Sequence, residues 1–192
     1  MTERSIENKE SQKGAIMIAN NLDYKFDDIL NVSVNRTMKK QYFDTRTYTM
    51  PGASQAVSTW NSGVDLIDVR NSYLKFKLTT DGDRTDNSFG TGTAMNLIKE
   101  VKVLSSSGIE LARTQESNLF HKFVVRSRKS ANWLTTVGSV MGSGVSTLDT
   151  AASGTILCIP LCELDPFFEL YDSKLLPANI ASGLRIEITW AS

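Results

Sequence analysis

Alternation of apolar and polar positions is the clearest pattern in this chain, and it predicts half-buried β-strands. In residues 184–190 (LRIEITW) every even-numbered position is apolar and every odd-numbered position is polar. Residues 73–79 (YLKFKLT) repeat the pattern, with Leu74, Phe76 and Leu78 on one face. Successive side chains of a strand point to opposite faces, so each segment has one face for a core and one for solvent.

Other runs are rich in β-branched and aromatic residues and stop at turn residues, which also favours strands. Residues 97–104 and 109–112 are joined by the Ser-Ser-Ser-Gly turn of 105–108, which predicts a hairpin. Residues 41–50, which stop at a Pro-Gly pair, and residues 155–161 predict further strands. The total is six or seven strands.

One helix is predicted over residues 115–126. Thr114 is placed to cap its first turn, and apolar side chains recur at helical spacing along one face. This stripe consists of Leu119, Phe120, Phe123 and Val124. We expect it to pack against the rest of the protein.

Two segments have the composition of loops. Residues 81–93 are dense in Asp, Gly, Ser and Thr, and residues 135–154 combine four glycines with many small polar residues. Because strands do not alternate with helices, the pattern predicts an all-β fold: an antiparallel two-sheet β-sandwich with one short helix and long Gly/Ser loops. We assign residues 37–192 to this domain and residues 1–36 to an N-terminal arm, flexible or ordered against a neighbour.

The net charge of the chain bears on which classes of function are expected. The 192 residues carry 21 Lys and Arg against 21 Asp and Glu, so the formal net charge is zero. A protein that binds phosphates generally has a basic excess, so we expect no specific nucleic-acid site, whereas near-zero charge favours association. No apolar run is long enough for a membrane span. The polar N-terminus does not have the character of a secretory signal, which predicts a protein made inside a cell.

Candidate catalytic and metal-binding residues are few. His121 is the only histidine, and with no nucleophile turn in the sequence we interpret it as a residue at the edge of a packed helix. Cys158 and Cys162, if they share one strand, lie about 13 Å apart, too far for a disulfide, so we expect both to be reduced and buried. Together with His121 they offer three zinc ligands, one fewer than a structural site usually takes. We predict no catalytic residue, no metal and no cofactor.

A cluster of acidic residues can be interpreted either as a calcium site or as a solvated turn. Residues 81–87 hold closely spaced carboxylates without the glycine and late glutamate of a helical calcium loop. A solvated turn is the expected state, and calcium at a subunit junction is the alternative.

Tyr42, Phe43 and Tyr48 alternate with basic residues, as in some nucleic-acid surfaces. Given the neutral net charge, we interpret them as an exposed strand face.

Two segments carry a family resemblance: residues 58–78 (STWNSGVDLIDVRNSYLKFKL) and residues 175–190 (LLPANIASGLRIEITW). Between them, in matching order, come LIKEVKVL, the SSGIEL return, a short helix and IPLCEL. Over most of residues 40–190 the chain resembles the single jelly-roll penton (vertex) capsid proteins of virophages and Polinton-like viruses.

The resemblance implies a jelly-roll fold and a structural role in the virion of an icosahedral virus. It implies homopentamers at the five-fold vertices, contact with the neighbouring major capsid protein, and minor capsid proteins as further candidate partners. It supplies no catalytic residues. A jelly roll has eight strands, one or two more than the pattern predicts. Either a late strand is missing from this sequence or the N-terminal segment supplies it.

Other interpretations are also compatible with the sequence. A minor or major single jelly-roll capsid protein is a variant of the first. A lectin-like or receptor-binding β-sandwich module belongs to a different class, with residues 81–93 or 135–154 as the binding loop. An enzyme ranks third. A capsid subunit forms rings or shells, whereas an isolated binding module stays a monomer or a small oligomer.

Overall fold

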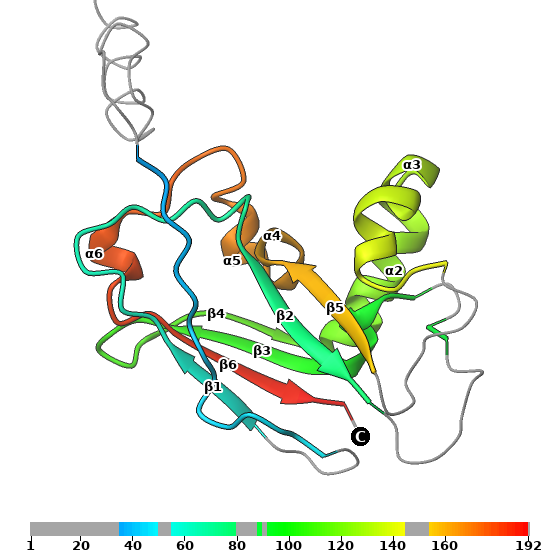
Figure 1. Cartoon of the computed structure of the whole chain (residues 1–192), viewed down its shortest axis with the longest axis horizontal. Helices are drawn as coiled ribbons and strands as arrows, with labels where there is room; N and C mark the ends of the chain where they lie inside the picture. The colour runs from blue at the N-terminus through cyan, green and yellow to red at the C-terminus, as the bar shows by residue number, and fades with distance from the viewer. Residues whose placement is uncertain (1–34, 50–54, 80–87, 90–91, 145–153, 192) are drawn as a thin grey trace, which may run out of the picture.

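The computed structural model describes residues 35–49, 55–79, 88–89, 92–144 and 154–191, which form two antiparallel sheets and several short helices (Figure 1). The strands are β1 (Gln55–Thr59), β2 (Tyr73–Leu78), β3 (Ile98–Leu104), β4 (Glu110–Gln115), β5 (Thr155–Pro160) and β6 (Arg185–Trp190). The helical segments are the 3-10 turn η1 (Ala94–Leu97), α2 (Ser117–Arg128), α3 (Ala131–Trp133), the π-helical turn η2 (Leu134–Gly138), α4 (Leu161–Leu164), α5 (Pro166–Glu169) and α6 (Ala178–Ala181).

The six strands pair in a nested order. β1 pairs with β6, β2 with β5, and β3 with β4, all antiparallel. β3 also pairs with β6, which gives a four-stranded sheet in the order β1-β6-β3-β4 and a two-stranded sheet of β2 and β5. The strands of the two sheets run in different directions (Figure 1). The predicted pair of antiparallel sheets is therefore confirmed, as is the β3–β4 hairpin, whose second strand extends to Gln115.

The inner faces of the two sheets meet in one hydrophobic core. As the alternation predicts, the even-numbered residues of 184–190 are buried and Arg185 is exposed. Leu157 and Ile159 of β5 belong to the same buried cluster. Trp190 joins the two sheets, because its ring centroid lies 5.7 Å from that of Phe76 on β2.

The outward face of the four-stranded sheet is polar. Glu187 on β6 accepts a hydrogen bond from Gln55 on β1 at 2.7 Å and pairs with Arg185 at 2.7 Å. Glu100 on β3 pairs with Arg113 on β4 at 2.5 Å. The contacts of Glu187 with Gln55 and of Glu100 with Arg113 join neighbouring strands, and each stabilises the sheet by about a few tenths of a kcal/mol.

The strand predicted at residues 41–50 is wrong, because residues 41–49 form no strand. The Asp44 N–H donates to the Val57 carbonyl at 2.9 Å, and the Asp44 carboxylate accepts from the Val57 N–H at 3.1 Å. The Val57 N–H therefore donates to the Asp44 side chain and not to a backbone carbonyl. Backbone pairing between this segment and β1 stops after one hydrogen bond. The segment still covers the free edge of β1, and its Phe43 and Tyr48 pack against the core.

The predicted helix is present as α2, and several short helical segments that were not predicted accompany it. The loop predicted to begin at residue 135 is wrong over its first part, because residues 131–140 are helical. Ser130 caps this segment by accepting from the Trp133 N–H at 3.2 Å, and the Thr136 hydroxyl donates to the Asn132 carbonyl at 2.8 Å. Small polar side chains that bond to the preceding turn are compatible with helix. Residues 145–153 of that loop, and residues 81–87, lie outside the described residues.

The predicted helix begins later than expected. α2 starts at Ser117, and Thr114 lies in β4, where its hydroxyl donates to Asp165 at 2.8 Å instead of capping the helix. Glu116, with a φ of 49°, turns the chain from strand into helix. This residue occupies the left-handed region, which side-chain-bearing residues adopt infrequently.

The buried face of α2 is not the apolar stripe. Its buried residues are Ser117, His121 and Val125, whereas the stripe residues Leu119, Phe120 and Phe123 are 61%, 53% and 68% exposed. The expectation that this stripe packs inward is therefore wrong for these three residues, while its fourth member, Val124, is half-buried. The helix docks on η1 and β3 through a mostly polar face.

Candidate functional site

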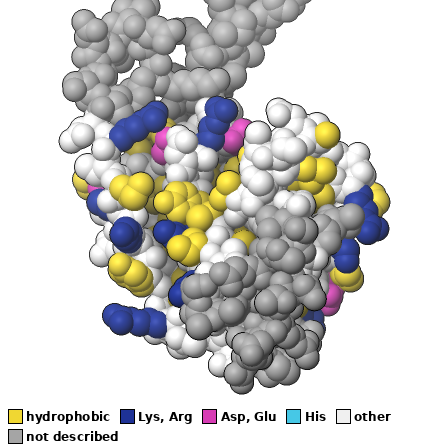
Figure 2. Space-filling model, turned by 45° about the vertical axis from the view of Figure 1, so that its right-hand side comes forward, with side chains coloured by type: hydrophobic (Ala, Val, Ile, Leu, Met, Phe, Trp, Pro, Cys, Tyr) yellow, Lys and Arg dark blue, Asp and Glu magenta, His cyan; other side chains and the backbone are white. Residues whose placement is uncertain are grey.

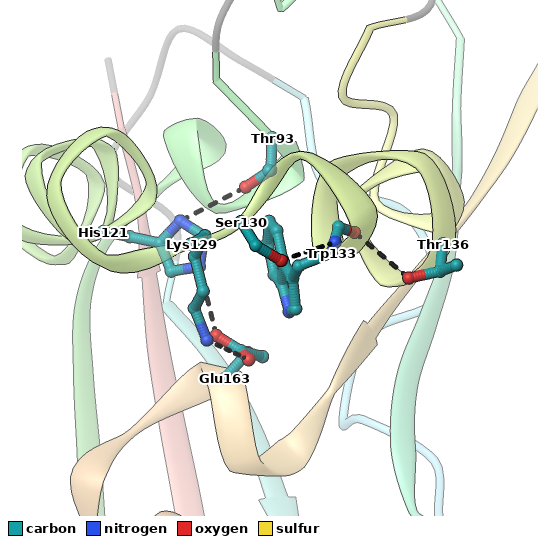
Figure 3. A network of polar contacts seen from close by, with 7 residues as sticks. All are labelled: Thr93, His121, Lys129, Ser130, Trp133, Thr136 and Glu163. Atoms are coloured by element: carbon teal, nitrogen blue, oxygen red, sulfur yellow. Dashed lines mark hydrogen bonds and ion pairs between the residues drawn. The ribbon is translucent and has the colours of Figure 1, made fainter.

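A polar cluster lies under α2 and consists of Thr93, His121, Lys129 and Glu163 (Figure 3). Thr93 Oγ1 is 3.3 Å from His121 Nδ1, and His121 Nε2 is 3.7 Å from Glu163 Oε2. Lys129 Nζ donates to Glu163 Oε1 at 2.5 Å. These side chains come from the residue before η1, from α2 and the residue after it, and from α4, so the cluster joins three segments. We call it the His121 cluster.

The hydrogen bonds favour one arrangement of protons. The Thr93 hydroxyl oxygen already accepts from the Met95 N–H at 3.3 Å, as the cap of η1, so its own hydrogen is available to His121 Nδ1. The imidazole proton then lies on Nε2, facing the Glu163 carboxylate. At 3.7 Å this contact is an electrostatic attraction and not a hydrogen bond.

Trp133 closes the cluster from the side of α3. Lys129 Nζ lies 4.8 Å from the centroid of the Trp133 ring, within cation–π range. The same ring lies 6.4 Å from the His121 ring. The cluster therefore also holds α3 against α2 and α4.

Two carboxylates on neighbouring turns are perturbed in opposite directions. Burial alone would raise the pKa of Glu163, but the contacts with His121 and Lys129 outweigh it and hold the pKa below its ordinary value. Burial also raises the pKa of Asp165, and its hydrogen bonds from the Phe167 N–H and Thr114 hydroxyl offset this only in part. The difference arises because Glu163 has a cationic partner in Lys129, whereas Asp165 accepts from the neutral Phe167 N–H and Thr114 hydroxyl.

The His121 cluster contains a hydroxyl, an imidazole and a carboxylate in the order of a hydrolase triad. Its location argues against that chemistry. Thr93 is fully buried and His121 is 4% exposed, and the Thr93 hydroxyl is already engaged as a helix cap. A nucleophile must reach its substrate, so we interpret this cluster as a structural joint between helices.

Replacing Glu163 tests this joint and its pH dependence. Glu163→Gln is expected to lower the free energy of unfolding by about 2 kcal/mol near neutral pH, because an amide cannot neutralise Lys129. Since the folded pKa of Glu163 lies below its ordinary value of 4.5, the stabilisation is complete above that value and is lost as pH falls through the folded pKa. The variant should lose stability less steeply in acid than the wild type, as measured by urea unfolding at a series of pH values.

Asp165→Asn is the matched control. The folded pKa of Asp165 is raised, so this group destabilises the fold above its pKa and the penalty fades as pH falls. Removing the charge, while asparagine still caps α5, should make the acid loss steeper than in the wild type. If the free energy of unfolding fell equally steeply with pH in the two variants, the opposite pKa shifts of Glu163 and Asp165 would be contradicted.

The three residues considered as zinc ligands, His121, Cys158 and Cys162, lie in three different elements. Cys158 lies on β5, but the chain turns into α4 after Pro160, so the assumption that Cys158 and Cys162 share a strand is wrong. Both cysteines are free and half-buried, not buried as expected. Burial, with the nearby negative charges of Glu163 and Asp172, raises the pKa of the Cys162 thiol, which disfavours a reactive thiolate. Across the described ranges, no group of three or more His, Cys, Asp or Glu side chains is arranged to hold a metal ion.

The aromatic residues considered for nucleic-acid binding do not form one surface. Tyr42 is 79% exposed, whereas Phe43 and Tyr48 are half-buried against the core. Of the neighbouring basic residues, Lys39 pairs with Asp65. The carboxylate loop of residues 81–87 lies outside the described residues.

Sequence reasoning identified His121 but not its partners. Glu163 is 42 positions away from His121 along the chain, and although Glu163 lies in the IPLCEL segment, no motif of that segment links it to His121 or Lys129. The turn from β5 into α4 brings Glu163 under α2. Because tertiary contacts alone assemble the cluster, no local pattern was available to find it.

Comparison with protein-family models, with curated proteins and with solved structures finds no match to this chain. In the part of the chain that the structure describes, none of the helices has the length and hydrophobicity needed to cross a membrane.

Proposed function

We propose that this chain is a structural subunit of an icosahedral virus capsid, a single jelly-roll penton protein that forms homopentamers at the vertices. In this proposal the pentamer contacts the neighbouring major capsid protein, with minor capsid proteins as further candidate partners. The chain acts by assembly, without a catalytic residue or a cofactor.

The nested strand pairing is the observation that carries the proposal. A jelly roll is a long antiparallel hairpin wrapped into two sheets, so that its strand pairs nest and alternate between the sheets. Here the pairs β1·β6 and β3·β4 belong to one sheet and β2·β5 to the other. The sequence segments that resemble penton proteins contain β2, β3 and β6, the end of β1 and the start of β4.

The described residues hold fewer strands than a complete jelly roll. An eight-stranded jelly roll has four strand pairs, whereas the described residues form three nested pairs. The wrapped hairpin closes early, at the turn of residues 105–109, and the chain between β4 and β5 is helical over residues 117–128 and 131–140. The second sheet therefore has two strands in place of four.

Electron microscopy of the purified chain tests the proposal. We expect negatively stained images to show five-fold rings or closed shells, because a cyclic assembly requires a repeated contact between identical copies. Uniform particles of monomer size at every protein and salt concentration would contradict it. A monomer would favour the binding-module class, and glycan screening would then be the next experiment.

A further inference from the structure

α2 turns an apolar face outward. Leu119, Phe120 and Phe123 are each more than half exposed. At about 100° per residue they fall within a single arc of roughly 100° around the helix, on the side opposite to His121. On the side of the molecule in Figure 2, hydrophobic side chains reach the surface beside Lys and Arg side chains. Several large apolar residues exposed together indicate a contact with a partner.

The same face of α2 is basic. Lys122 and Arg126 lie beside Leu119 and Phe123 at helical spacing, and α2 itself contains no acidic residue, although Glu116 immediately precedes it. We call this the α2 surface, which consists of Leu119, Phe120, Lys122 and Phe123. A partner that fits it presents an apolar side chain among carboxylates.

A second surface of this chain has that chemistry. At the end of α5, Leu170 is 72% exposed, and the flanking Glu169 and Asp172 are also exposed. Within the described ranges neither carboxylate forms an ion pair, in contrast to Asp65, which pairs with Lys39. We call Glu169, Leu170 and Asp172 the α5 surface.

The two surfaces face different sides of the molecule. α4 packs against α5, and Glu163 of α4 faces His121 on the buried side of α2. The α2 surface, on the opposite side of that helix, therefore faces away from α4 and α5. Figure 1 shows α2 and α5 apart from one another. The two surfaces do not meet within one chain, so they are available to meet between two copies.

We infer that the α2 surface of one copy binds the α5 surface of the next copy. This inference rests on the proposed function and names the contact that builds the ring. Two different, complementary patches make a head-to-tail contact, which closes into a ring when the rotation between copies permits. Phe123 packs on Leu170, and Lys122 faces Glu169 and Asp172, which fixes the register by charge.

Charge reversal tests the contact. Lys122→Glu and Glu169→Lys should each weaken assembly by about tenfold or more in dissociation constant, because each places like charges together. The double variant Lys122→Glu/Glu169→Lys should restore it, since the charges are exchanged in every contact of a head-to-tail ring. Lys75→Glu, on the outward face of β2, is the matched control and should assemble as the wild type does. Sedimentation velocity measures assembly, and circular dichroism confirms that each variant is folded.

The outcomes separate this inference from the proposed function. An assembling wild type, two weakened single variants and a restored double variant support both. If the wild type assembles and the single variants assemble equally well, or the double variant is not restored, the α2–α5 contact is wrong and the capsid role stands. A wild type that stays monomeric overturns both.

Discussion

Trp190→Ala is expected to lower the free energy of unfolding by about 3 to 5 kcal/mol, the largest effect of any single substitution considered for this protein. Trp190 ends β6 with 7% of its surface exposed. Its ring lies 5.7 Å from Phe76 of β2 and 5.9 Å from Tyr48 of the segment that covers β1. Removing it opens a cavity where the two sheets and the covering segment meet, so all three lose packing contacts.

Urea unfolding monitored by circular dichroism, at one fixed protein concentration, measures the Trp190 effect. Trp190→Phe is the control and should cost about 1 to 2 kcal/mol, because a smaller ring still fills much of the space. The loss of stability in Trp190→Phe is small also because the buried indole N–H of Trp190 has no hydrogen-bond partner among the described residues. A Trp190→Ala variant as stable as Trp190→Phe would show that this side chain does not join the layers.

Gly183→Ala is expected to lower the free energy of unfolding by about 3 kcal/mol. Gly183 has a φ of +80°, which favours glycine. A Cβ placed there would lie 2.6 Å from the Cβ of Ser106, in the turn between β3 and β4. Backbone strain and a steric clash therefore add at the point where that turn packs against the start of β6.

Gly108→Ala separates the two causes. Gly108 has a nearly identical φ of +81°, but a Cβ placed there meets no atom within 4 Å. Backbone strain alone should lower the free energy of unfolding of Gly108→Ala by about 1 kcal/mol. Thermal or urea unfolding compares the two variants, and Ser106→Gly introduced into Gly183→Ala should recover part of the difference. Equal losses at both glycines would mean that the clash with Ser106 contributes nothing.

The structure confirms the strands predicted at residues 97–104, 109–112 and 155–161, which were recognised by their β-branched residues and turns. Two further confirmed strands were recognised because large apolar side chains alternate with polar or charged ones. Residues 73–79 and 184–190 alternate in this way, and their apolar positions face the core. β1 gave no such signal, because the residues that it buries are Ala56 and Ser58. A strand whose inward positions are small is buried by its neighbours on the sheet, and hydrophobicity alone does not reveal it.

α2 was misjudged for a related reason. Amphipathic patterning identifies an apolar face, but it does not say whether that face meets the core or another molecule. Here His121 is buried because Thr93 and Glu163 provide polar partners for the imidazole, and the apolar face is left outside. The His121 cluster escaped prediction because its members are distant in sequence and share no motif.

The native mass of the purified chain tests the central claim most directly. Native mass spectrometry over a range of protein concentrations should find a dominant species of five times the 21.2 kDa chain mass, as a cyclic vertex subunit requires. A single species of 21.2 kDa at all concentrations and salts would contradict assembly as the function of this protein.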